Sequence, residues 1–292
     1  MLITIFTPLY NRASYLDRVY QSILNQNDLE IEWIIVDDGS VDHPRSIIDP
    51  WITEADFKII YQYQNNQGKH TAINKGIELA SGAYFFILDS DDYLPKNALL
   101  NTRAKIDLID SNDAFAGVCG RRCYRNGKII GLEFQKDIKS NSLDIRFSHK
   151  ISGDLVEVFR TDVLRENLFP VFDKERFCPE ALVWNRIAQN YNLLFFNEPI
   201  YVCEYLSDGL TSNIVKIRMK SPKASMLYYS ELFKAPIPFV QKLKALLNFW
   251  RFSFNSSQSL SLKFKYINNF WSLLILPLGL VFFLKDLILI RT

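Results

Sequence analysis

The stretch that decides the fold is YFFILDSDDYLP, from Tyr84 to Pro95. A run of bulky apolar residues leads directly into three carboxylates within four positions, Asp89, Asp91 and Asp92. The apolar run predicts a buried strand, whereas like charges at this spacing repel one another and are costly to bury without a partner. The sequence therefore predicts a strand whose carboxyl end holds something cationic.

The first hundred or so residues alternate between apolar strands and helical patterns. The predicted strands are residues 2–10, 31–40, 57–64 and 83–89. Three helices are predicted: one that begins after Ser14 as its cap, one over residues 70–82, and one that begins at Pro95. This alternation predicts a parallel sheet covered on both faces. Ligands bind at the carboxyl ends of strands in such sheets. Three of the four predicted strands end there in polar residues, in the segments TPLYN, DDGS and DSDD.

From about residue 113 the pattern loosens, and the region is typical of a second lobe that completes a cleft. Short strands are predicted at residues 114–120, 128–131 and 152–160, followed by a helix from Pro179 to Tyr191. Residues 193–205 predict a strand, a turn and another strand. The polar loop from Glu204 to Asn213 is interpreted either as a lid over a ligand or as a simple connector.

The last fifty-odd residues differ in kind. Residues 239–254 have helical spacing, with basic side chains among large apolar groups. The uncharged run from Phe270 to Leu284 has 15 residues, whereas a membrane-spanning helix needs about 20. Pro277 and Gly279 are expected to interrupt it. We interpret this tail as a membrane-surface or re-entrant anchor; a packing or dimerisation arm and a single span are the alternatives.

Composition excludes several classes of protein. The chain has 292 residues, of which 48% are hydrophobic, and its formal charge of +2 does not favour binding to nucleic acid. Its four cysteines lack paired C-x-x-C spacing, so buried reduced thiols in a cytosolic protein are expected in place of a zinc site. The first residues predict a strand and not a signal peptide. The oligomeric state is not predicted.

The two acidic segments suggest ligands of different kinds. The DSDD cluster best fits a divalent ion with oxygen ligands, Mn²⁺ or Mg²⁺, that bridges carboxylates to a diphosphate; the alternative is a solvated turn that caps the next helix. The segment from Asp37 to Ser40 supplies acceptors for a base edge or a ribose, although such a motif is also common in turns. No G-x-G-x-x-G follows the first strand, which argues against NAD or FAD.

Three segments, in this order and spacing, resemble the inverting family 2 glycosyltransferases of the GT-A fold. They are FTPLYNRASYLDRVYQSILNQ, EWIIVDDGSVD and NNQGKHTAINKGIELASGAYFFILDSDDYL, within roughly residues 1–110. The resemblance implies an α/β GT-A fold with a Rossmann-like, mostly parallel sheet, followed here by an amphipathic helical tail. We therefore expect a nucleotide-sugar-binding half at residues 1–112, an acceptor-binding and catalytic-base half at 113–235, and a membrane-associating tail at 236–292.

The resemblance also implies a donor site. Asp91 and Asp92 would hold the ribose and the metal bound to the donor diphosphate, and Asp89 would support them. The other implied donor-binding residues are Thr7, Pro8, Tyr10, Asn11, Asp37, Asp38, Lys69 and Asn74. Where many members have ARN this chain has TAIN, so an arginine near the diphosphate is missing and Lys69 is expected nearest the donor. His70 is a further cation, or an ordinary residue of the helix.

An inverting transfer is a single displacement, which needs one general base to deprotonate the acceptor hydroxyl. The segment CPEALVWNRIA resembles the family's base-bearing motif but lacks the aspartate that usually follows its acid. Glu180 is therefore the expected base; alternatively, its charge complements the helix dipole. Asp154 is the second candidate, as base or as acceptor ligand. No Q-x-x-R-W motif occurs, so transfer of a single sugar is expected.

These inferences together predict a metal-dependent inverting glycosyltransferase that uses a nucleotide-sugar, expected to be a UDP-sugar. The tail suggests a saccharide acceptor, lipid-linked or otherwise presented at the membrane, in surface polysaccharide synthesis. The protein would then be cytoplasmic and peripheral on the inner face of the cell membrane. A nucleotidyltransferase and a non-catalytic membrane scaffold with the same fold are the two rival interpretations.

Overall fold

The structure is a computed structural model that describes residues 1–204, 213–267 and 270–291. The chain divides into two compact units, which are described separately. The first contains Met1–Leu168 and Arg186–Tyr205, and the second contains Phe169–Asn185 and Leu206–Thr292. The functional boundaries expected near residues 112 and 235 stay a prediction. The predicted loop from Glu204 to Asn213 falls almost entirely outside the described residues.

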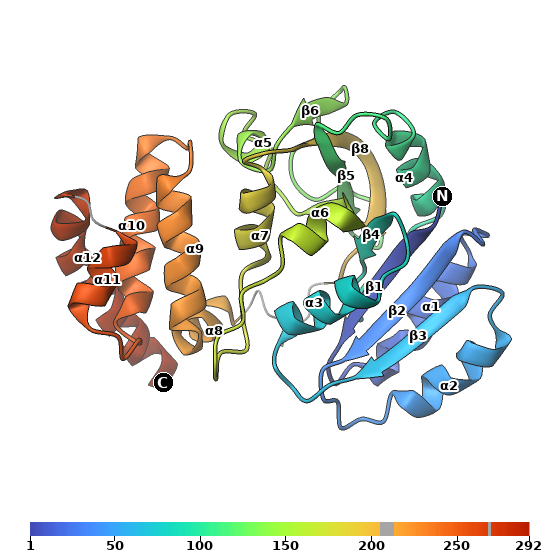
Figure 1. The fold of residues 1–292 in the computed structure, drawn as a ribbon, viewed down its shortest axis with the longest axis horizontal. Coiled ribbons are helices and arrows are strands. Elements are labelled where there is room, and N and C mark those ends of the chain that lie inside the picture. The colour runs from blue at the N-terminus through green and yellow to red at the C-terminus, as the bar shows by residue number, and fades with distance from the viewer. Residues whose placement is uncertain (205–212, 268–269, 292) are drawn as a thin grey trace. The chain divides into compact units, whose positions relative to one another are not determined.

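The first unit is built on an eight-stranded sheet with the order β3-β2-β1-β4-β7-β5-β8-β6 (Figure 1). Its first four strands are β1 (Ile3–Leu9), β2 (Ile31–Asp37), β3 (Lys58–Tyr63) and β4 (Tyr84–Ile87). All three pairings among them are parallel, with β1 between β2 and β4. The predicted parallel half of the sheet is therefore confirmed, and the carboxyl ends of these strands lie at one edge.

The other half of the sheet is mixed. Strand β7 (Leu155–Arg160) runs antiparallel to β4 and to β5 (Phe115–Cys123). Strand β8 (Asn192–Val202) runs parallel to β5 and pairs antiparallel with β6 (Ile138–Ser140).

Two strand predictions in this half are wrong. Residues 193–205 were expected to turn, yet β8 is continuous, because shifts in its register with β5 accommodate Pro199, which has no N–H to donate to the ladder. Residues 128–131 form no strand and contribute only a bridge between Cys123 and Ile129.

Helices of the first unit connect these strands. Their bounds are α1 (Leu16–Leu24), α2 (Arg45–Glu54), α3 (Lys69–Leu79), α4 (Ala98–Ile106), α5 (Asp144–Phe147) and α6 (Thr161–Glu166). The cap predicted at Ser14 is wrong, because a short 3-10 turn (Ala13–Tyr15) precedes α1 and Tyr15 is its N-cap. Helix α4 begins three residues after the predicted Pro95, since Asn97 adopts a φ of 64° immediately before it.

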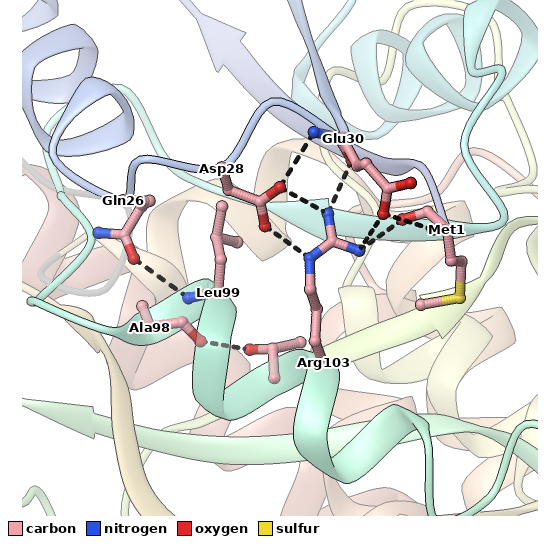
Figure 2. A network of polar contacts seen from close by, with 8 residues as sticks. Met1, Gln26, Asp28, Glu30, Ala98, Leu99 and Arg103 are labelled. Atoms are coloured by element: carbon pink, nitrogen blue, oxygen red, sulfur yellow. Dashed lines mark hydrogen bonds and ion pairs between the residues drawn. The ribbon is translucent and has the colours of Figure 1, made fainter.

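A polar network ties α4 to the amino ends of β1 and β2 (Figure 2). The guanidinium of Arg103 donates to both carboxylate oxygens of Asp28, at 2.5 and 3.0 Å, and to the carbonyls of Met1 and Glu30. Bidentate charge-assisted pairs of this kind fix geometry well. The amino-terminal edge of the sheet is thereby fastened by the chain's own side chains.

The second unit is helical. After the beginning of α7 (Glu180–Ile187) it comprises α8 (Ile214–Lys220), α9 (Pro222–Lys234), α10 (Phe239–Ser253), α11 (Leu260–Tyr266) and α12 (Phe270–Arg291). The helix predicted at residues 239–254 is thus confirmed as α10. A cluster of buried side chains joins α9, α10 and the end of α11: Met226, Leu246, Phe249, Trp250 and Ile267.

Helix α12 is continuous for 22 residues, so the predicted interruption at Pro277 and Gly279 is wrong. Close packing on α10 explains the glycine, because a Cβ at Gly279 would lie 2.5 Å from the Cβ of Trp250. By length and composition, Phe270–Ile288 is the one helix among the described residues that could cross a membrane, and 17% of it is buried. This segment extends the uncharged 15-residue run read from the sequence through Lys285 and Asp286 to Ile288.

Candidate functional site

The three acids lie in a turn at the carboxyl edge of the sheet, here called the acidic turn (Asp89–Asp92). The turn is closed by the N–H of Asp92, which donates to the carbonyl of Asp89 at 3.1 Å. Directly after it, Tyr93 forms a bridge with Val202 at the end of β8, with N–O distances of 3.1 and 2.8 Å. The acidic turn is thus held between the end of β4 and the end of β8.

Each acid faces a different cation of the chain. The Nζ atom of Lys69 lies 2.6 Å from Oδ1 of Asp89. Two arginines lie slightly farther away: Arg12 Nε is 3.8 Å from Asp91 Oδ2, and Arg122 is 3.8 Å from Asp92 Oδ2. Helix α3, the segment after β1, and β5 supply these partners. The sequence prediction of a cation at this place is therefore met in part by the chain itself.

Side chains from β5 and β8 hold the acidic turn in place. The N–H of Asp89 donates to the hydroxyl of fully buried Tyr201 at 2.9 Å, and the guanidinium of Arg122 lies 4.3 Å from the centre of the Tyr201 ring. The N–H of Glu204 donates to Asp92 Oδ1 at 3.0 Å. Arg18 pairs with the Glu204 carboxylate at 2.9 Å and also donates to the carbonyl of Asp91.

Burial is the largest influence on the pKa of all three carboxyls, and by itself it raises the pKa. At Asp89 the charges of Lys69 and Arg122 outweigh burial, so the pKa of Asp89 is lowered. At the other two, the negative charge of Asp89 adds to burial, and it raises the pKa of Asp91 and brings the pKa of Asp92 to about 7. Additional positive charge beside Asp91 and Asp92 would therefore favour their ionised forms.

The second acidic segment, at the end of β2, has both carboxylates engaged. Asp38 is buried and accepts from Gln64 Nε2 at 2.7 Å and from the N–H groups of Gln67 and Gly68, each at 2.8 Å. Asp37 accepts from the hydroxyl of Tyr61 at 2.6 Å. Asp38 thus shapes the loop that leads into α3 and, through it, the position of Lys69.

The remaining implied donor residues surround the end of β1. Thr7 and Pro8 are buried in β1, and Thr7 Oγ1 accepts from Trp33 at 2.9 Å. Tyr10 is 49% exposed, which leaves its ring free to meet a planar ligand. Asn11 has a φ of 51° and accepts from the N–H of Val41 at 2.9 Å. Its side chain therefore joins the loops after β1 and β2.

Helix α3 carries three further candidates. Asn74 is half-buried. His70 is buried, and its Nδ1 has no hydrogen-bond partner in the described part of the chain. Burial lowers the pKa of His70 against the opposing charge of Asp38, so the neutral imidazole is favoured. Lys69 is the cation of this helix that reaches the acidic turn.

The two candidate bases lie in different units. Asp154 is an exposed residue of the first unit, directly before β7. Burial, the charge of Asp92 and, to a smaller extent, the charge of Asp154 raise the pKa of Cys203 to about 11. Glu180 is half-buried and opens α7 in the second unit. The first unit therefore brings together Asp37, Asp38, Lys69 and the acidic turn, and the role of Glu180 stays a prediction.

The donor set of the acidic turn fits a hard divalent cation. Carboxylate oxygens are the ligands that Mn²⁺ and Mg²⁺ prefer, and the raised pKa values at Asp91 and Asp92 indicate a shortage of positive charge. Over residues 1–204, 213–267 and 270–291, no group of three His, Cys, Asp or Glu side chains is placed to hold a metal by itself. Mg²⁺ commonly binds through one or two carboxylates together with substrate phosphates.

Apart from Lys69, sequence reasoning missed the residues that contact the acidic turn. Arg12, Arg18, Arg122, Tyr201 and Glu204 were not identified, because their contacts depend on which strands become neighbours. One signal was present in the segment GRRC, where two arginines interrupt an otherwise apolar strand. A charged side chain in such a strand calls for a partner on an adjacent element.

The family described as Glycosyl transferase family 2 matches residues 4–164, which include the acidic turn and, except for the first residue of β1, the strands β1 to β7. This range is more than half of the chain. The chain belongs to glycosyltransferase family 2. The resemblance inferred from its motifs is thereby confirmed, as is the expectation of an enzyme of the glycosyltransferase class.

One relative carries a name that describes its reaction. The GalNAc(5)-diNAcBac-PP-undecaprenol beta-1,3-glucosyltransferase of Campylobacter jejuni is 29% identical over 189 residues, which are 62% of this chain and 58% of the relative. The match thus spans less than two thirds of that protein.

Solved structures support the predicted GT-A fold. The structure of S. aureus TarS 1-349 in complex with UDP-GlcNAc has a TM-score of 0.65 and 21% identity, and the match covers 98% of this chain and 81% of TarS 1-349. Mannosyltransferase PcManGT from Pyrobaculum calidifontis, in complex with GDP-Man and Mn²⁺, has a TM-score of 0.58 and 17% identity, covering 96% of this chain and 79% of PcManGT. At these identities the likeness establishes the fold alone.

Proposed function

We propose that this family 2 glycosyltransferase moves one sugar from a nucleotide-sugar to a hydroxyl of a membrane-presented saccharide, with inversion and with the help of a divalent metal. The observation that carries the proposal is the acidic turn, whose three carboxylates face Lys69, Arg12 and Arg122 at the carboxyl edge of the parallel strands. The charge of a nucleotide diphosphate can be neutralised by a metal held by carboxylates and by cationic side chains, and this edge supplies the carboxylates and the cationic side chains.

The donor nucleotide would lie along the ends of β1 and β2. Exposed Tyr10 is suited to stack on the base, and the loop organised by Asp38 borders the same edge. We expect a UDP-sugar as donor; the TarS structure with UDP-GlcNAc, which has the same fold, supports the choice. Thr7, Asn11 and Asp37 would shape this site chiefly through contacts with neighbouring strands and loops.

Asp91 and Asp92 would hold the metal, and Asp89 would position the turn around it. When bound, Mn²⁺ or Mg²⁺ would neutralise charge on the leaving diphosphate. Lys69 and Arg122 would supply further positive charge from the protein side, in place of the arginine that the TAIN segment lacks. The Mn²⁺ complex of PcManGT supports this choice of ion.

Glu180 would act as the general base that removes the proton of the acceptor hydroxyl, with Asp154 as the second candidate. A single displacement requires the base on the acceptor side of the sugar, opposite the leaving diphosphate. Replacing Glu180 by Gln keeps the size of the side chain and removes its basicity. Transfer should then fall by at least about a hundredfold, the low end of what general-base catalysis supplies, while UDP binding is unchanged.

The acceptor would be a lipid-linked saccharide, of the kind used in surface polysaccharide synthesis, at the inner face of the cell membrane. The Campylobacter relative, whose name specifies an undecaprenol-linked substrate, supports this choice. One face of α12 carries large apolar side chains that are 38–68% exposed: Phe270, Trp271, Leu273, Leu274, Leu278, Leu280, Val281, Leu284 and Ile288. Such a face suits the interfacial layer of a bilayer.

Vesicle flotation tests this membrane contact. The double change Leu274→Asp with Val281→Asp places charge on the exposed face of α12 and should abolish flotation with vesicles containing anionic lipid. Leu108→Asp is the matched control, because Leu108 is 69% exposed in the first unit. Equal flotation of both variants would contradict the membrane proposal.

Activity is tested by incubating the protein with UDP-, GDP- and ADP-sugars and a panel of lipid-linked saccharides, with Mn²⁺ or EDTA. The proposal predicts product only with a UDP-sugar and metal, with inverted anomeric configuration by NMR. A nucleotidyl product would favour the rival class. Retained configuration would contradict the single displacement.

A further inference from the structure

The segment that leads into Glu180 belongs to the same compact unit as the C-terminal helices. Residues Phe169–Asn185 join Leu206–Thr292 in this unit, across some twenty intervening residues of the first unit. The segment has no regular structure before Pro179. Its position must therefore come from specific contacts, and two of its side chains provide them.

Glu175 caps helix α9 from a distance in sequence. The side chain is buried, and its two oxygens accept from the N–H groups of Lys223 and Ala224 at 2.8 and 2.9 Å. The N-cap residue, Ser221, makes no side-chain cap of its own, and Pro222 has no N–H. The carboxylate thus satisfies the donors that the first turn of a helix leaves without a partner.

The surroundings of Glu175 favour a single position of its side chain. Burial raises the pKa of its carboxyl, and the two N–H groups of α9 and the charge of Lys223 oppose that rise. A negative side chain at the amino end of a helix is also favoured by the helix dipole. Both oxygens are engaged at once, so the carboxylate has little freedom to move without leaving a donor unpaired.

A second contact lies two residues farther on. The guanidinium of Arg218, in α8, is 6.0 Å from the centre of the Phe177 ring and donates to the hydroxyl of Tyr229 in α9 at 2.7 Å. Ser225, also in α9, donates to the carbonyl of Arg218 at 3.2 Å. Phe177 therefore rests against a side chain that is itself fixed by α9.

The same helices connect to α12. Tyr229 stacks on Phe252 of α10 with ring centres 5.9 Å apart. Helix α10 then holds α12 through Trp250, which donates to Ser272 at 2.8 Å, and through a bidentate ion pair between Arg251 and Asp286. A continuous set of contacts thus leads from the segment before Glu180 to the helix with the exposed apolar face.

We infer that the C-terminal helices position the base, and that Glu175 is the positioning residue that fastens the Glu180 segment to α9. This inference rests on the proposed function for the role of Glu180. It assigns the tail a part in the transfer step: the unit that docks at the bilayer carries the base with it, so that the base is brought to a membrane-bound acceptor. The C-terminal helices would then both bind the membrane and position the base.

Glu175→Ala tests the inference, with Asp173→Ala as the matched control, because Asp173 is an exposed carboxylate of the same segment. We expect Glu175→Ala to lower the kcat of sugar transfer by at least about tenfold, with UDP affinity and the number of UDP sites within about twofold of wild type. A merely misfolded fraction would instead lower the number of UDP sites in the same proportion. Asp173→Ala should leave all three quantities unchanged.

Two further measurements keep the outcome clear. Glu175→Gln retains one acceptor oxygen and should fall between wild type and Glu175→Ala, and hydrogen exchange at the amides of Lys223 and Ala224 should speed up in both variants. Wild-type kcat or unchanged exchange in Glu175→Ala would overturn the inference. Wild-type activity in Glu180→Gln would contradict the assignment of Glu180 as the base in the proposed function. If Glu180→Gln is inactive and Glu175→Ala is fully active, only the positioning inference is overturned.

Discussion

Asp38→Asn replaces a buried carboxylate with an amide of the same shape. The carboxylate accepts three hydrogen bonds, at 2.7, 2.8 and 2.8 Å, from Gln64, Gln67 and Gly68. The amide oxygen can keep the two bonds made by Oδ1, but its NH₂ group then faces the N–H of Gly68. Two donors oppose each other there, and a buried N–H loses its partner.

The magnitude follows from these three contacts. Leaving the buried N–H of Gly68 unpaired costs about 1–3 kcal/mol, and the two remaining bonds each weaken by about 1 kcal/mol when the acceptor loses its charge. Because the neutral amide costs less to bury than a carboxylate, part of this loss is offset. The expected fall in the free energy of unfolding is about 3 kcal/mol, or roughly 6–12 °C in Tm.

Urea denaturation of the protein without nucleotide measures this change, and calorimetry with UDP measures its consequence for binding. We expect weaker UDP binding as well, because the loop that Asp38 shapes leads into Lys69. Asp49→Asn is the control, since Asp49 is an exposed carboxylate of α2. If Asp38→Asn unfolds with the same free energy as wild type, Asp38 does not organise this loop, and any loss of UDP binding must come from direct contact with the nucleotide.

Three further predictions concern stability. Gly76→Ala should destabilise the protein by about 1–2 kcal/mol despite the better helix propensity of alanine, because its Cβ would lie 2.3 Å from ring atoms of buried Phe6; a more stable variant in urea denaturation would contradict this. Arg251→Ala should lower the free energy of unfolding by about 3–5 kcal/mol, because it leaves the Asp286 carboxylate buried and unpaired, and the double variant with Asp286→Leu should regain most of that stability. Urea denaturation of both variants shows whether the two residues are energetically coupled. Burial raises the pKa of Glu32, but the hydrogen bonds that its carboxylate accepts lower this pKa below 4.5 overall, so the stability that Glu32 contributes is present above pH 4.5 and is lost as the pH falls through the folded-state pKa. Glu32→Gln should therefore flatten the acid side of the curve of unfolding free energy against pH. An unchanged acid side would show that Glu32 does not contribute.

The parallel half of the fold could be predicted because its signals are local. Its strands are rich in β-branched and aromatic residues, and the polar residues that end them lie at the same edge of the sheet whatever the details of packing. The acidic turn and Asp37–Asp38 are therefore found in the sequence where the structure places them. Family motifs then added roles that local patterns do not carry.

Apart from Lys69, the partners of the acids could not be predicted, because they depend on long-range pairing. Arg122 meets Asp92 only because β5 lies beside β8, and Tyr201 meets Asp89 because the end of β8 forms a bridge with Tyr93, directly after the acidic turn. The sequence predicted a metal as the cation, whereas each acid also has a cation of the chain. Local rules also failed at Pro199, which a register shift with β5 accommodates, and at Pro277, which lies inside the continuous helix α12.

The central claim is that the acidic turn binds a nucleotide diphosphate together with a metal. Calorimetry of UDP, with GDP and ADP for comparison, in Mn²⁺ and in EDTA, tests it on the wild type, on Asp92→Asn, and on Asp173→Asn as a control. The account predicts UDP binding that requires Mn²⁺, is lost in Asp92→Asn, and is unchanged in Asp173→Asn. No UDP binding, or binding of equal strength in EDTA and in Asp92→Asn, would contradict it.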